Sequence, residues 1–291
     1  MDGPVEIALG NGKVWRPTDM GGPSGAPMSL REGLEQSKNT VTAQVMQDVG
    51  PQAVVRFARA AGVRAAPLDP VPSLALGTSP VSLLEMATAY STLASLGQYR
   101  APQMLTHITD RDGQVLARFD DEKPPEFSID RDVAEKLVDV MRGVVTRGTG
   151  AALKREFGVK GDLAGKTGTT QNNTDGWFIA INPGLVAGAW VGFNDQRVTI
   201  RSSYWGQGAH NALRIVGDFM RQGQRGKLID LGNNFPVVVR PQPESAPEPV
   251  ATTPEPNEWD DQARNPSPEN GPGLPMLPMS STETWRSNPH Q

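Results

Sequence analysis

The chain has 291 residues, of which 37% are hydrophobic, so it is long enough to bury one sizeable core. It contains no cysteine, which excludes a disulfide, a thiol nucleophile and a cysteine-ligated metal site. The net charge is −4, and the segment after residue 240 holds eight acidic and two basic residues, so residues 1–240 sum to about +2. Neither part is basic enough to bind nucleic acid by phosphate neutralisation, and we expect no nucleic-acid partner.

Helices dominate the first hundred residues after a loop-like start over residues 1–28, where glycine-rich turn signals separate short apolar pieces. Ser29 and Glu32 have the spacing of a capping box, which opens a helix. Apolar residues at helical spacing, bounded by glycine, predict three further helices, the last of them capped by Ser79. We therefore expect helices over about 29–37, 41–50, 51–62 and 79–97.

Strands dominate the second half. Residues 103–119 are typical of a hairpin, because a turn at Asp112 and Gly113 separates two extended stretches. Asp130 then caps a helix, and a last amphipathic helix covers about 209–221. The inner face of the helix after Asp130 is predicted to carry Val133, Leu137, Val140, Met141 and Val144. Three β-like stretches lie between these helices, at 163–170, 176–182 and 185–193.

A run of helices followed by an antiparallel sheet with a covering helix predicts an α+β fold with a helical half and a sheet half. Proline is concentrated towards the C-terminus, and apolar periodicity disappears there. We expect one domain over residues 1–230 and a proline-rich, acidic, disordered tail over residues 231–291.

Two short motifs carry the chemical signal. One is Ser37-Lys38-Asn39 at a predicted helix end, and the other is Lys166-Thr167-Gly168-Thr169 on a predicted strand. In this order, they match two of the three signatures of penicillin-binding proteins and serine β-lactamases, which are S-x-x-K, S-D-N and K-T-G. The middle position of the second signature is Lys38 rather than aspartate, which is closer to transpeptidases than to that β-lactamase form. Either motif alone would be weak evidence, whereas the pair in these structural settings is specific.

The likeness extends over roughly residues 1–222, which resemble the transpeptidase domain of class A, bifunctional penicillin-binding proteins. It is carried by the segments 9–17, 29–41, 75–94, 145–153 and 164–183. The resemblance implies the penicillin-binding and serine β-lactamase fold. It also implies an enzyme that cross-links peptidoglycan stem peptides ending in D-Ala-D-Ala, that β-lactams inhibit, and that works at the periplasmic face of the bacterial inner membrane without a cofactor.

The resemblance assigns roles to individual residues of the strand motif. Lys166, with its cation, and the hydroxyls of Thr167 and Thr169 would lie where the donor's terminal carboxylate binds. Gly168 has no side chain, so substrate can approach the strand closely. The backbone N–H of Thr169 would be one donor of the oxyanion hole.

The resemblance also assigns roles to the other motif. Ser37 would relay a proton between the nucleophile and the leaving amine, with its hydroxyl held by Lys166. Asn39 would hydrogen-bond a backbone amide of the substrate. The expected catalytic residues are therefore Ser37 and Lys166, and the expected substrate ligands are Asn39, Thr167, Gly168 and Thr169.

The sequence departs from the family at the nucleophile. The serine that is acylated belongs to S-x-x-K, and no serine or threonine of this chain is followed by lysine three residues later. We therefore expect a domain that is inactive alone. The glycosyltransferase domain and membrane anchor of the family, which lie upstream, are missing too, so we expect the chain to be an N-terminally truncated piece. The alternative is a non-catalytic peptidoglycan-binding or scaffolding module that kept the groove.

The remaining polar and aromatic residues give weaker signals. Gly165-Lys166-Thr167 imitates the end of a phosphate-binding loop, but Lys160 stands where its first glycine is required. Asp175 is more typical of a turn than of acid–base catalysis. The three histidines are too scattered for a metal site, and the aromatic residues Trp177, Phe178, Trp190 and Phe193 are expected in the core. The tail is expected to be a spacer, although it could hold docking segments for another cell-wall protein.

Overall fold

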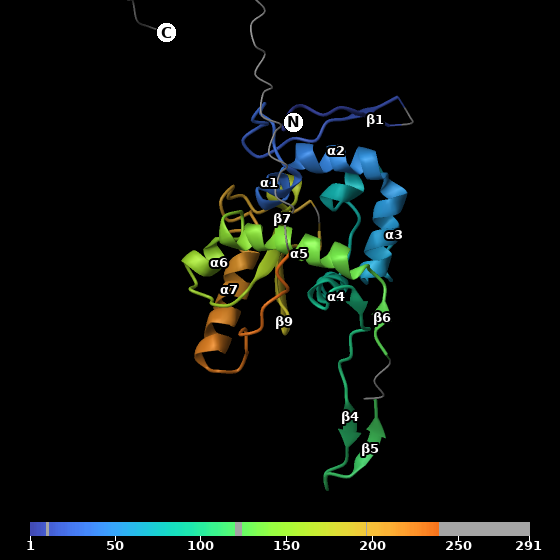
Figure 1. Cartoon of the computed structure of the whole chain (residues 1–291), viewed down its shortest axis with the longest axis vertical. Coiled ribbons are helices and arrows are strands. Elements are labelled where there is room, and N and C mark those ends of the chain that lie inside the picture. The colour runs from blue at the N-terminus through green and yellow to red at the C-terminus, as the bar shows by residue number, and fades with distance from the viewer. Residues whose placement is uncertain (10–11, 120–123, 196, 239–291) are drawn as a thin grey trace, which may run out of the picture. The chain divides into compact units, whose positions relative to one another are not determined.

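The computed structural model describes residues 1–9, 12–119, 124–195 and 197–238 (Figure 1). They belong to one compact unit that extends to Arg240. Leu231 and Phe235 are buried within this unit, so its packing continues beyond the domain boundary predicted at residue 230. The tail predicted from residue 231 lies outside the described residues from residue 239 onward.

Helices contain more of the described residues than strands do. They are α1 (Leu30–Glu35), α2 (Asn39–Val49), α3 (Pro51–Ala61), α4 (Leu83–Ala94), α5 (Arg131–Thr146), α6 (Ala152–Arg155) and α7 (Ala212–Arg225), with 3-10 turns η1 (Pro72–Leu76) and η2 (Gln171–Asn173). The strands are β1 (Ile7–Ala8), β2 (Val14–Trp15), β3 (Gln98–Tyr99), β4 (His107–Thr109), β5 (Val115–Arg118), β6 (Glu126–Phe127), β7 (Ala164–Thr169), β8 (Asp175–Asn182) and β9 (Leu185–Gly192). The predicted α+β class is confirmed.

The main sheet is antiparallel, in the order β7-β8-β9. Successive residues of β8 point to opposite faces, and the register places Lys166 opposite Ile179 and Thr167 opposite Phe178. Ile179 is buried among residues of α4 and α5. Phe178 is buried on the other face, among residues that include Leu213 of α7. The two residues of the strand motif therefore face different halves of the molecule.

One edge of this sheet is open. Every residue of β7 pairs with a residue of β8 on one side, and no strand of the described residues pairs with the opposite side of β7. A strand at a sheet edge keeps a row of unpaired backbone N–H and C=O groups. Ala164 and Gly165 are buried, so the part of this edge that an added peptide strand can reach is the end of β7 at Gly168 and Thr169.

The start of the chain differs from the prediction. Residues 1–28 contain the two-residue strands β1 and β2, which pair antiparallel, so strands precede the helices. Their shortness explains why no alternation was visible in the sequence. The hairpin predicted at 103–119 is present as β4 and β5, which pair over only three registered positions and extend away from the helices (Figure 1).

Two local predictions about helices are wrong. α4 is capped by Ser82, whose hydroxyl accepts from the Glu85 N–H in a capping box, whereas Ser79 accepts from the N–H of Asp69. Ser82 rather than Ser79 caps the helix because a glutamate lies three residues after it and completes the capping box. In α5, Val133 is 46% exposed, and the buried row begins at Ala134.

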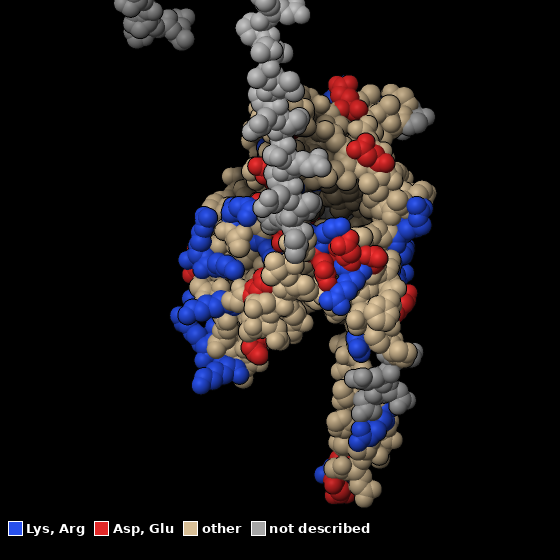
Figure 2. Space-filling model, viewed as in Figure 1, with Lys and Arg blue, Asp and Glu red and all other residues tan. Residues whose placement is uncertain are grey.

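The outer surface of the sheet half is basic. Figure 2 shows Lys and Arg side chains gathered over α6 and α7. These helices carry Lys154, Arg155, Arg214, Arg221 and Arg225. The sequence did not predict this cluster, because the two helices are distant in the chain and acidic residues elsewhere offset their charge. The absence of a nucleic-acid partner stays a prediction.

Candidate functional site

Ser37 lies in the tight connection between α1 and α2. The Lys38 N–H donates to the Gly33 carbonyl at 2.8 Å, and the Ser37 N–H donates to the Leu34 carbonyl at 3.2 Å. This pair of bonds is the Schellman ending of a helix, which places one residue in the left-handed region and usually uses glycine there. Here that residue is Ser37, with φ 57°. An uncommon backbone conformation therefore presents an exposed serine hydroxyl.

Lys166 meets this hydroxyl. Its Nζ donates to Ser37 Oγ at 2.6 Å and to the Thr167 carbonyl at 3.0 Å. Burial lowers the pKa of the Lys166 ammonium to about 8. A lysine with such a pKa can exist in both protonation states near neutral pH, so it can exchange a proton with the hydroxyl that it holds. β7 continues as a strand through Thr169, which excludes a phosphate-binding loop, since that loop would open a helix.

Thr167 is buried on the other face of β7, and its Oγ1 lies 2.6 Å from Oγ1 of Thr149. Thr149 follows the C-terminal end of α5, and sequence reasoning assigned it no role. The signal was present in segment 145–153, which contributed to the family resemblance. One of the two hydroxyls donates to the other, so the pair keeps a second proton for another acceptor.

Thr169 ends β7 and is exposed. Its hydroxyl accepts from the Gly208 N–H at 3.0 Å, and Gly208 is pressed against the sheet. A Cβ at Gly208 would lie 2.2 Å from the Gly168 carbonyl oxygen, so only glycine fits. The loop before α7 thereby fixes the orientation of the Thr169 side chain at the end of the open edge.

Asn39 is not brought into this cluster by any hydrogen bond that the structure contains. It begins α2, its backbone N–H donates to Asp19 Oδ1, and its side-chain amide donates to the Thr18 carbonyl at 2.7 Å. These bonds fasten the segment before α1 to the first turn of α2. The role of Asn39 as a substrate ligand stays a prediction.

Asp175 and the neighbouring aromatic residues lie in strands. Asp175 is the first residue of β8 rather than part of a turn, and burial raises the pKa of its carboxyl. Trp177 and Trp190 are paired across β8 and β9, with ring centroids 6.4 Å apart. Phe193, predicted in the core, is 48% exposed, because it lies just after the last residue of β9.

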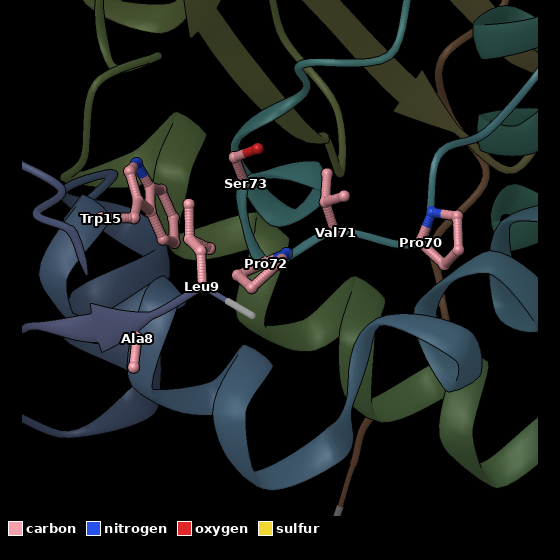
Figure 3. A pocket seen from close by; sticks show the side chains of 7 residues that line it. All are labelled: Ala8, Leu9, Trp15, Pro70, Val71, Pro72 and Ser73. Carbon is pink, nitrogen blue, oxygen red and sulfur yellow. The ribbon is translucent and has the colours of Figure 1, made fainter. Parts of the chain in front are cut away.

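A hollow of about 470 Å³ lies elsewhere, between the β1–β2 pair and the segment that leads into η1. Figure 3 shows Leu9 and Trp15 on one side of it and Val71 and Pro72 on the other. Its lining contains no titratable side chain, so it lacks the convergent polar groups of a catalytic site.

No group of three or more histidine, aspartate or glutamate side chains among the described residues is placed to hold a metal ion. No helix in the described ranges has the length and apolar character needed to cross a bilayer.

Comparison with known proteins identifies the family. The model of the penicillin binding protein transpeptidase domain matches residues 6–186, a range that contains both motifs. The chain belongs to this family. Its relatives include penicillin-binding protein 1A of Neisseria gonorrhoeae, which is 34% identical over 224 residues covering 75% of this chain and 27% of that protein. Penicillin-binding protein 1A of Rickettsia bellii is 32% identical over 241 residues, covering 75% and 30%.

The transpeptidase fold is also found among solved structures. Penicillin-binding protein 1A of Haemophilus influenzae superposes with a TM-score of 0.68 at 23% identity, covering 82% of this chain and 40% of that one. The PonA1 protein of Mycobacterium tuberculosis in complex with penicillin V gives a TM-score of 0.64 at 24% identity, covering 81% and 65%. This chain therefore spans less than a third of the length of the curated relatives given above.

Proposed function

We propose that this chain forms the part of a peptidoglycan D,D-transpeptidase site that binds the acyl donor and relays the proton. The observation that carries the proposal is the 2.6 Å contact between Lys166 Nζ and Ser37 Oγ beside the open edge of β7. Family membership supports the reaction class. The substrate is a stem peptide that ends in D-Ala-D-Ala and adds along β7 as an extra strand.

The donor's terminal carboxylate binds at the end of β7. Thr169 presents its hydroxyl there, and Thr167 contributes the hydroxyl that it shares with Thr149. Lys166 adds a positive charge from the other face of the strand. Gly168 keeps the strand surface low enough for a backbone to approach, and the Thr169 N–H stabilises the oxyanion. Asn39 binds a substrate amide if its side chain turns away from the Thr18 carbonyl.

Acyl transfer then needs a serine nucleophile. The serine hydroxyl attacks the carbonyl between the two D-alanines, a serine ester forms, and the C–N bond breaks. Ser37 passes a proton to the departing D-alanine amine, and the acceptor amine of a second stem peptide later displaces the serine. No S-x-x-K or T-x-x-K occurs in this sequence, so the nucleophile must come from a segment outside it, and the chain alone is inactive.

The intact protein follows its relatives in the remaining respects. We place it at the periplasmic face of the bacterial inner membrane, held by an upstream anchor, with β-lactams as covalent inhibitors. Penicillin V binding by the related PonA1 supports the inhibitor class. The segment after residue 240 serves as a spacer.

A second candidate is a non-catalytic peptidoglycan-binding module, which the missing nucleophile favours. Reading the genomic DNA upstream of Met1 separates the two. An in-frame segment that encodes S-x-x-K would exclude the module, and a promoter directly before Met1 would favour it.

The proposal is tested by incubating the purified chain with a fluorescent penicillin. We expect no adduct that survives denaturation, because the acylated serine is absent. A labelled band would show that another residue is the nucleophile and would overturn the proposed division of roles.

A further inference from the structure

Ser37 occupies a backbone position that a serine rarely adopts. Left-handed conformations cost a non-glycine residue of order 1 kcal/mol or more, and they persist only where the surroundings determine them. α1 is six residues long, too short to hold its own end rigidly. Some contact outside α1 must therefore fix the turn that presents Ser37.

The contact is made two residues earlier. Glu35 is buried at the end of α1, and its carboxylate receives two bonds from the Arg147 guanidinium, from Nε to Oε2 at 2.7 Å and from Nη2 to Oε1 at 2.5 Å. Arg147 follows the last residue of α5. This two-pronged geometry fixes the direction of the carboxylate as well as its distance.

α5 is shaped to admit Glu35. A Cβ at Gly143 would lie 1.9 Å from Glu35 Oε1, and one at Gly148 would lie 2.3 Å from the Glu35 carbonyl oxygen. That carbonyl also accepts from the Thr149 N–H at 3.1 Å. The side chain of Glu35 therefore packs against the last turns of α5, and its backbone packs against the segment that follows the helix.

The segment just after α5 is tied to β7, because the hydroxyls of Thr149 and Thr167 lie 2.6 Å apart. Thr167 is adjacent to Lys166 in the strand. The contacts consequently form a closed path from Ser37 through Glu35, α5 and β7 back to Lys166. Each contact restricts the positions that the Ser37 hydroxyl can take relative to the Lys166 ammonium.

We infer that Glu35 is a positioning residue, which holds the Ser37 hydroxyl against Lys166 through its paired bonds to Arg147. The inference rests on the proposed function for its meaning, since Ser37 and Lys166 matter as a proton relay. Glu35 touches no reacting atom. Its effect on the chemistry passes through the left-handed turn at Ser37.

The test is the pKa of the Lys166 ammonium, followed by NMR titration of the purified chain. The variant E35Q removes a negative charge, and by charge alone it would lower the pKa of a nearby lysine. Loss of positioning would instead raise the pKa of Lys166. If the Ser37 turn moves away, water reaches Lys166 and the pKa rises from about 8 towards 10.5.

A second variant covers the case in which E35Q fails to fold. R147K keeps the charge but loses the planar fork, and the Arg147 side chain is 57% exposed, so folding should survive. We expect the Lys166 pKa to rise in this variant too. E135Q is the matched control, because it breaks the Arg131–Glu135 ion pair in the first turns of α5, far along the helix from Arg147, and it should leave the Lys166 pKa unchanged.

The outcomes separate the possibilities. A rise in E35Q and R147K, with E135Q unchanged, supports the positioning role. A lower melting temperature with an unchanged Lys166 pKa would show that Glu35 contributes to stability alone. A fall in the Lys166 pKa in E35Q would show that Glu35 acts on Lys166 only through its charge. Either result overturns the inference. The titration needs neither peptide nor penicillin, so its failure is distinct from failure of the proposed function.

Discussion

Thr149 and Thr167 place their hydroxyl oxygens 2.6 Å apart, joining the segment after α5 to β7 beside Lys166. Valine has nearly the same shape as threonine but no hydroxyl, so T149V leaves the buried Thr167 hydroxyl without its partner. We expect a loss of about 1–2 kcal/mol in the free energy of unfolding for either single variant. The double variant should lose less than the two single losses together.

Urea denaturation of the four chains gives this coupling energy. T78V is the control, since Ser73 and Thr78 form an exposed hydroxyl pair at 3.1 Å, and its effect should stay within about 0.5 kcal/mol. Strictly additive losses for T149V and T167V would show that the two hydroxyls do not interact in solution.

Gly208 should tolerate no side chain. A Cβ there would lie 2.2 Å from the Gly168 carbonyl oxygen and 2.4 Å from that of Trp177, both of which are backbone atoms. We expect G208A to cost roughly 1–3 kcal/mol in denaturation and to shift the NMR signals of Thr169. G3A is the control, because nothing lies within 4 Å of its added Cβ. Equal stability of the two variants would contradict the packing of the loop against β7.

The lowered pKa of Lys166 should make the stability of the chain depend on pH. Burial lowers its pKa to about 8 in the folded chain, against 10.5 ordinarily. Between these values the unfolded chain binds more protons, so the contribution of Lys166 to the free energy of unfolding rises with pH. K166M should therefore be more stable than the parent chain below pH 8, and this advantage should disappear as pH approaches 10.5.

The advantage is at most about 3 kcal/mol, because solvent reaches part of the site. Denaturation at a series of pH values measures it. K136M should show the opposite trend, since the exposed ion pair with Asp132 raises the pKa of Lys136. A K166M advantage that stays constant between pH 8 and 10.5 would mean that the Lys166 ammonium is not desolvated.

The central sheet was predictable because its signals are local. Apolar runs that contain β-branched and aromatic residues marked β8 and β9, and Pro183-Gly184 between them favours a tight turn. The pairing of Ser37 with Lys166 was implied by the family resemblance, and the contact between their side chains agrees with it.

What the sequence could not predict depends on contacts between distant segments. The left-handed turn at Ser37 is fixed from outside α1, and the Thr149 hydroxyl gains its partner only when α5 packs beside β7. The prediction placed the cap of α4 at Ser79 instead of Ser82, because the hydroxyl of either serine could accept a backbone N–H. The sequence predicts that Phe193 lies in the core, but β9 ends at Gly192, just before it.

The most direct test of the donor site is an NMR titration of the chain with a peptide that ends in D-Ala-D-Ala, compared with the same peptide as a C-terminal amide. The account predicts shifts at residues 166–169 that weaken strongly with the amide and in K166M, because the carboxylate binds beside Lys166. Equal shifts with acid and amide, shifts confined to the hollow around Trp15, or no shifts at all would contradict it.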